Sequence, residues 1–116
     1  MPSQSFKTLI VWQKSSEFAV HIYKAFSGLR DYSFRDQIQR SSISISNNIA
    51  EGYARHSDKA FRNFLMIAKG SATETESMLE VAKRLRYLTD ERAESLLAQL
   101  SEIHRLINGF LKTLKY

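Results

Sequence analysis

Apolar side chains recur every three or four positions along almost the whole chain, which is the spacing of one face of an α-helix. Alternation typical of strands is never sustained, because the brief example at 42–46 lies inside a longer helical period. The single proline stands at position 2, and the four glycines leave long uninterrupted segments. The pattern predicts helices at about residues 9–26, 34–54, 59–87 and 90–114.

Small polar residues mark the ends of these segments. Gly28 is predicted to end the first helix, since glycine readily adopts the left-handed conformation that closes helices. Side-chain oxygens that accept from the first free amides are predicted to start the other three. The predicted caps are Ser33, Ser57 or Asp58, and Thr89.

Each predicted helix has one apolar face, and the connections between them are short. The third has a near-heptad seam that includes Phe61, Leu65, Ala68 and Ala72. Four such helices bury their faces most economically as an all-α, antiparallel, up-down-up-down four-helix bundle. We therefore expect residues 1–116 to form a single four-helix-bundle domain.

The second predicted helix is rich in Ser and Asn, which are mediocre helix formers. Beside its apolar stripe runs a line of polar side chains, so this face is expected to meet another surface. Glu51 and Arg55 stand four apart in the order that favours pairing along a helix. The line consists of Gln37, Arg40, Ser44, Asn48, Glu51 and Arg55.

Two glycines, Gly52 and Gly70, lie inside predicted helices, where each costs about 1 kcal/mol relative to alanine. Each is therefore predicted to permit a close backbone approach. Ser71 extends the small-residue run after Gly70, which could admit a helix of the same chain or of another subunit. Glu74 could face Glu51 across the second and third helices.

Composition limits the class of protein. The chain has 116 residues, 43% hydrophobic and 25% charged, which are the values of an ordinary globular domain. It has neither an apolar run long enough for a bilayer nor a secretory signal at its start, so no membrane association is expected. Cysteine is absent, which fits a reducing, cytoplasmic location.

The net charge is +5 and is unevenly placed. Residues 1–69 hold ten Lys or Arg against five Asp or Glu, whereas residues 70–116 hold seven of each. A basic half favours a polyanionic partner, RNA or DNA, although the charge could serve solubility alone. The candidate phosphate-binding cations, which could equally form a solvated face, are Arg30, Arg35, Arg40, Arg55, Lys83, Arg84 and Arg86.

Catalytic and metal-binding patterns are missing from the sequence. His21, His56 and His104 do not pair at helical spacing, and no Glu-x-x-His motif is present. No glycine-rich phosphate loop occurs either. The sequence therefore predicts a protein with no cofactor, no metal and no enzymatic activity.

One string carries a family resemblance. Residues 44–52 read SISNNIAEG, and residues 67–71 read IAKGS. With LIVWQK at 9–14 and RDQI at 35–38, they make the chain resemble the 23S rRNA intervening-sequence protein family, also called four helix bundle proteins. The last helix matches only in general character, and Ala60 stands where an acidic residue is usual.

The resemblance implies a small bacterial four-helix bundle that assembles as a homopentamer. Relatives of this kind include the accessory protein of diversity-generating retroelements, which binds nucleic acid and a reverse transcriptase. The leading hypothesis is therefore a ring-forming bundle that binds RNA or DNA through basic faces. The alternative is a protein–protein interaction scaffold without a nucleic-acid role. Packing or subunit contacts are assigned to Ser44, Asn48, Glu51, Gly52, Gly70, Ser71 and Glu74.

Overall fold

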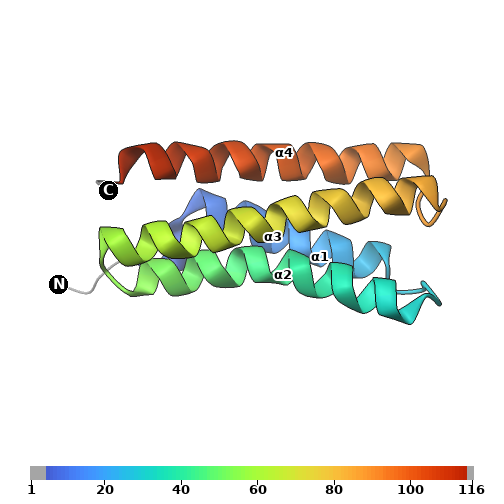
Figure 1. Ribbon diagram of the computed structural model, residues 1–116, viewed down its shortest axis with the longest axis horizontal. Helices are drawn as coiled ribbons and strands as arrows, with labels where there is room; N and C mark the ends of the chain where they lie inside the picture. The colour runs from blue at the N-terminus through green and yellow to red at the C-terminus, as the bar shows by residue number, and fades with distance from the viewer. Residues whose placement is uncertain (1–4, 115–116) are drawn as a thin grey trace.

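The computed structural model describes residues 5–114. A short 3-10 helix, η1 (Phe6–Thr8), precedes α1 (Ile10–Ala25), α2 (Tyr32–Ala54), α3 (Asp58–Arg84) and α4 (Asp90–Thr113). Successive α-helices run in opposite directions along the long axis of a molecule that measures 48 × 23 × 20 Å (Figure 1). α2 packs against α1 and α3, and α4 packs against α3 and α1. The predicted all-α, antiparallel, up-down-up-down bundle is confirmed, and residues 5–114 contain no strand.

Side-chain caps begin three of the four α-helices. Ser57 and Thr89 accept from backbone amides three residues later at 3.2 Å each, as their positions predict. The prediction of Ser33 as the cap of α2 was wrong. Asp31 takes that place, because its Oδ1 accepts from the amide of Phe34 at 3.2 Å. α2 therefore begins at Tyr32, and Ser33 lies within its first turn.

The left-handed residues after the helices are not the expected glycine. Gly28 does not have a positive φ, whereas His56 (φ 55°) and Arg86 (φ 63°) do. α3 ends at Arg84 and stops short of the predicted 87. The Tyr87 amide donates to the carbonyl of Ala82 at 2.9 Å, and the Arg86 amide donates to the carbonyl of Lys83 at 3.2 Å. This pair of bonds is a Schellman motif with arginine at the position that glycine usually holds.

The core lies where the apolar period predicts it. Buried residues of α3 repeat in steps of four and three, the heptad spacing of a packed seam. Three apolar residues beside this seam lie outside the core: Phe64 and Met78 are partly exposed, and Leu85, just after α3, is exposed. The buried residues of α3 are Phe61, Leu65, Ala68, Ala72, Thr75, Leu79 and Ala82.

Small residues let α2 and α3 approach closely. A Cβ built on Gly52 would lie 2.5 Å from the Cβ of Phe64, which confirms the predicted close approach there. No such approach occurs at Gly70 within the described chain, since a Cβ there would meet nothing within 4 Å. An approach from another subunit at Gly70 stays a prediction. Glycine permits contact only where a neighbouring backbone is near.

Buried hydroxyl groups join the two helices further along. Ser41 Oγ lies 2.8 Å from Thr75 Oγ1, and Thr75 Oγ1 donates to the carbonyl of Ser71 at 2.8 Å. Ser44 Oγ and Ser71 Oγ are 2.9 Å apart at the edge of the same seam. Two of the serines that weaken α2 as an isolated helix, Ser41 and Ser44, therefore join it to α3.

Candidate nucleic-acid interface

The polar line of α2 borders a groove of about 220 Å³ between α2 and α3. Gln37 Nε2 reaches Glu74 Oε2 at 3.5 Å across it, and Asn48 Nδ2 donates to the carbonyl of Ser44 at 2.8 Å. The structure thus brings most of the predicted packing residues to one seam. The groove is lined by Gln37, Arg40, Ser41, Ser44, Ser71 and Glu74.

Glu51 lies two turns beyond this groove and does not face Glu74. Its Oε1 pairs with Arg55 Nη2 at 3.2 Å along α2, as their spacing predicts. The guanidinium of Arg55 also lies over the ring of Phe64, 5.1 Å from its centroid. Arg55 is therefore an exposed cation whose charge already has an acidic partner.

An exposed apolar stripe on α3 runs beside the α2–α3 groove. Ile67, Val81 and Leu85 expose 52%, 44% and 49% of their surface. Ile67 and Val81 belong to a second heptad series that precedes each core position from Leu65 to Ala82 by one residue, and Leu85, the C-cap residue just after α3, continues it. This outer stripe of α3 consists of Ile67, Ser71, Glu74, Met78, Val81 and Leu85.

Most predicted phosphate-binding cations gather at one end of the bundle, where the α1–α2 and α3–α4 loops lie (Figure 1). Arg35 pairs with Asp36 at 3.0 Å, and Lys83 pairs with Glu94. Arg40 instead lies along α2, in the groove with Ser44. Arg30, Arg84 and Arg86 are exposed at this loop end, which also holds Asp31, Asp36, Asp90, Glu91 and Glu94.

Hydrogen bonds shift three pKa values at the loop end. The hydrogen bond from Tyr87 and then that from the Phe34 amide lower the pKa of Asp31. The same contact with Asp31 raises the pKa of Tyr87. Glu94 raises the pKa of Lys83 through their hydrogen bond. Each shift favours the protonation state that the interaction requires.

The aromatic side chains near these cations pack inward. The ring centroid of Phe34 lies 5.3 Å from that of Tyr87, and Tyr53 lies 5.7 Å from Phe61. Tyr32 is exposed, and the guanidinium of Arg35 lies 4.9 Å from its ring centroid. Of Tyr32, Phe34 and Tyr53, Tyr32 is thus the exposed one.

A basic groove lies between α3 and α4 that the sequence pattern did not predict. It encloses about 470 Å³ near the start of α3 and the end of α4. Arg62 Nη1 donates to the carbonyl of Leu111 at 3.4 Å. Across residues 5–114, no carboxylate lies within 4.0 Å of Arg62, Lys69 or Lys112. The groove is lined by Arg62, Met66, Lys69, Asn108, Leu111 and Lys112.

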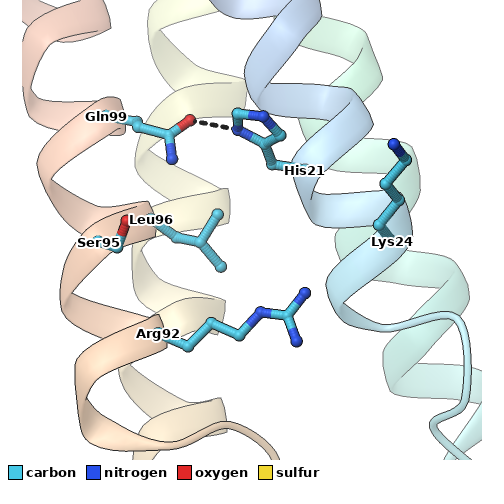
Figure 2. A pocket seen from close by; sticks show the side chains of 6 residues that line it. All are labelled: His21, Lys24, Arg92, Ser95, Leu96 and Gln99. Carbon is cyan, nitrogen blue, oxygen red and sulfur yellow. Dashed lines mark hydrogen bonds between the residues drawn. The ribbon is translucent and has the colours of Figure 1, made fainter.

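A second basic hollow, the α1–α4 pocket, encloses about 280 Å³ (Figure 2). His21 Nδ1 lies 2.8 Å from Gln99 Oε1 across its upper edge. The His21 side chain is 41% exposed. The pocket is lined by His21, Lys24, Arg92, Ser95, Leu96 and Gln99.

The other histidines make no shared site. His56 is exposed at the end of α2. His104 is partly buried, and its Nε2 lies 3.5 Å from Glu76 Oε1 without forming a hydrogen bond. Within residues 5–114, no group of three or more His, Asp or Glu side chains is placed to hold a metal ion. No helix in that range has the length and apolar character to cross a membrane.

Comparison with known proteins gives one family. The family model described as "23S rRNA-intervening sequence protein" matches residues 7–109, which confirms the resemblance drawn from the SNNIAEG and IAKGS strings. A crystal structure of a protein of unknown function from Bacteroides thetaiotaomicron, assigned to the S23 ribosomal protein family, is 39% identical. The match covers 90% of this chain and 100% of that one, with a TM-score of 0.83. No curated protein matches the chain.

Proposed function

Because the chain belongs to the 23S rRNA-intervening sequence protein family, we propose that it is a non-enzymatic, oligomeric helical-bundle protein that binds RNA or DNA through a basic surface. The α3–α4 groove is the observation that carries this proposal. Its three cations come from two helices and meet no carboxylate within residues 5–114, so their charge is available to phosphates. The family name alone identifies no ligand.

The groove suits a nucleic-acid strand in shape and chemistry. Arg62 and Lys69 are seven residues apart, which spaces their backbones by about 10 Å along α3. Lys112 adds a cation from the opposite wall, and Asn108 adds a hydrogen-bonding amide. Phosphate contacts of this kind position a strand without reading its sequence.

A salt titration tests the proposal. We expect a single-stranded RNA or DNA oligonucleotide to bind at low salt and to weaken steeply as salt rises, because neutralised phosphates release counterions. Replacing Arg62, Lys69 and Lys112 with glutamine should reduce the slope of log affinity against log salt by about 2 units. Fluorescence anisotropy at several salt concentrations measures this slope.

A matched variant separates the groove from bulk charge. Changing Arg30, Arg35 and Arg84 to glutamine removes the same formal charge from the loop end. We expect this loop-end variant to lose less affinity for the oligonucleotide than the groove variant does. Equal losses from both variants would assign the binding to net charge, and no binding at low salt would remove the nucleic-acid proposal altogether.

We also propose that a second copy of the chain covers the outer stripe of α3, beside the α2–α3 groove. The support is the exposure of Ile67, Val81 and Leu85, which leaves apolar surface at three points along this stripe open to a partner. Successive copies that repeat one such contact would close a ring, and the family resemblance favours five copies.

Light scattering tests the assembly. At micromolar concentration we expect several times the chain mass of 13.4 kDa. Replacing both Ile67 and Val81 with lysine should give the monomer mass, because burying unpaired charge is costly. Val20 is also half exposed but lies on α1, so Val20→Lys should leave the assembly intact. A monomeric wild-type protein would contradict the assembly.

The second candidate function is a protein-interaction scaffold in which the charge is incidental. The outer stripe of α3 favours it, since exposed apolar residues in a row are typical of a docking face. A protein that assembles but does not bind either nucleic acid at low salt would support the scaffold over the proposal above.

A further inference from the structure

We propose that the α1–α4 pocket binds a phosphate monoester. Lys24 lies in the last turn of α1, and Arg92 lies in the first turn of α4. The antiparallel order of the two helices places these cations around one hollow, although they are far apart in sequence (Figure 2). Their charges together match those of a phosphate monoester, which carries close to two negative charges at neutral pH.

Both cations are free to take an anion. Among residues 5–114, neither Lys24 nor Arg92 has a carboxylate within 4.0 Å, and no Asp or Glu lines the pocket. Lys14, Arg35 and Lys83, by contrast, each have an acidic partner. The guanidinium fork lies on the α4 wall and the flexible Lys24 side chain on the α1 wall, so both can donate to the oxygens of one phosphate group once the Lys24 ammonium turns toward Arg92 (Figure 2).

Neutral donors complete the pocket. The Gln99 side-chain oxygen can only accept, so His21 Nδ1 carries the hydrogen of their 2.8 Å bond. That bond holds the Gln99 amide with its nitrogen on the side of Leu96, toward the pocket (Figure 2). Ser95 adds a hydroxyl, and Leu96, only 4% exposed, forms an apolar wall that strengthens charge interactions near it.

The neighbouring part of the same helix seam limits the size of the ligand. Beyond the His21–Gln99 bond lies a hollow that contains Glu17 and Glu102. Glu102 pairs with Lys14 at 3.2 Å, and Glu17 Oε1 lies 3.9 Å from His21 Nε2. A phosphodiester chain following the seam would meet these carboxylates, whereas a single phosphate group would not. The volume of about 280 Å³ likewise suits a small group.

Two sources could supply such a phosphate: a free phosphorylated small molecule or the 5′-phosphate at the end of a nucleic-acid strand. The proposal concerns the shared group and does not depend on the binding assigned to the α3–α4 groove. The first experiment therefore uses inorganic phosphate alone, with the ionic strength held constant by chloride.

An NMR titration of backbone amides tests the site. We expect saturable shifts near Lys24, Arg92 and Ser95, and at least a tenfold weaker affinity when Lys24 and Arg92 are both replaced with glutamine. Both side chains are exposed, so circular dichroism should show an unchanged fold. The control pair Lys7→Gln and Arg105→Gln removes the same charge outside the pocket and should leave the affinity unchanged.

The outcomes divide clearly. Shifts that do not saturate, or that survive the double substitution, would overturn the site, as would equal losses in the control pair. If the site holds, oligonucleotides with a 5′-phosphate and a 5′-hydroxyl identify the source. Tighter binding of the 5′-phosphate, lost in the Lys24 and Arg92 variant, supports a strand end, and equal binding supports a free phosphorylated molecule. Neither result depends on Arg62, Lys69 or Lys112.

Discussion

The phenol of Tyr87 donates a hydrogen bond to Asp31, with 2.7 Å between Oη and Oδ2. The other oxygen of Asp31 accepts from the amide of Phe34 and starts α2. The ring of Phe34 in turn packs edge-on against Tyr87. One carboxylate therefore joins the α1–α2 loop to the α3–α4 loop and caps a helix.

Removing the phenol should change the acid stability of the protein. Because the hydrogen bond from Tyr87 lowers the pKa of Asp31, Tyr87→Phe should raise that pKa toward its ordinary value of about 3.9. A lowered carboxyl pKa stabilises the fold above the unfolded value, and this contribution disappears as pH falls through the folded pKa. The stability gap between wild type and Tyr87→Phe should therefore close in acid.

At alkaline pH the stabilisation from this hydrogen bond falls as the pH rises. Asp31 raises the pKa of Tyr87, so the contribution is present below about pH 10 and is lost as pH rises through the raised value. Carboxyl carbon NMR and urea unfolding across pH measure both effects. Tyr32→Phe, at an exposed tyrosine, is the control and should leave Asp31 unchanged. An unchanged pKa for Asp31 in Tyr87→Phe would contradict the account.

Alanine at two glycines should act in opposite directions. Gly70→Ala should stabilise the bundle by about 1 kcal/mol, because alanine is the better helix former. At Gly52 the new methyl group would lie 2.5 Å from the Cβ of Phe64, so overpacking of about 1–3 kcal/mol should outweigh that gain. Urea unfolding measures both.

A third glycine provides the reference for that pair. A Cβ on Gly109 would meet nothing within 4 Å, so Gly109→Ala should gain as much as Gly70→Ala. Loss of stability at Gly70 alone would show that another chain lies against it. A gain at Gly52 would show that Phe64 moves aside easily.

The buried hydroxyl pair should be energetically coupled. Ser41 and Thr75 lie 2.8 Å apart, and Ser41 is only 6% exposed. Thr75→Val should cost about 1–3 kcal/mol, since it leaves a buried donor less well satisfied. Ser41→Ala with Thr75→Val should cost less than the sum of the single changes.

The partly exposed pair Ser44 and Ser71 serves as the comparison for that cycle. Water can replace either partner there, so the coupling between Ser44→Ala and Ser71→Ala should be smaller. Denaturant unfolding of both sets gives the two coupling energies. Strict additivity at Ser41 and Thr75 would rule out a direct interaction.

Glycine at position 86 should stabilise the end of α3. Arg86 has φ 63°, and a side chain in this region costs about 1–2 kcal/mol that glycine avoids. Arg86→Gly should therefore raise the free energy of unfolding by about 1 kcal/mol. Thermal unfolding measures it, and Arg84→Gly within the helix should lower stability by about 1 kcal/mol. Loss of stability from Arg86→Gly would show that the arginine side chain itself holds the loop.

The helices could be predicted because their apolar period is long and repeated. The heptad from Phe61 to Ala82 specifies a buried seam whatever its partner, and Ser57 and Thr89 are the residues that helix starts favour. The end of α3 was less predictable, because Arg86 holds a conformation that its residue type disfavours. Tertiary contacts of Tyr87 decide that end, and the sequence does not display them.

The candidate sites depended on tertiary arrangement. Gly52 follows Ile45 and Ile49 on the buried face of α2, whereas Gly70 lies off the buried seam of α3, but the contact of Gly52 with Phe64 appears only in the folded bundle. Arg62 and Lys69 share a face by their spacing, but Lys112 joins them only through the antiparallel packing of α4 against α3. Lys24 and Arg92 meet for the same reason. Clusters formed within one segment were visible in the sequence, and those formed between segments were not.

The serines of α2 make this helix dependent on its neighbour. A peptide spanning 31–55 should remain a coil in water, because short helices of weak formers do not nucleate alone. The hydroxyls of Ser41 and Ser44 also bond within α2, but their contacts with Thr75 and Ser71 form only when α3 lies beside them. This segment therefore becomes helical only as it docks on α3. Any change that separates α3 from α2 should also unfold α2.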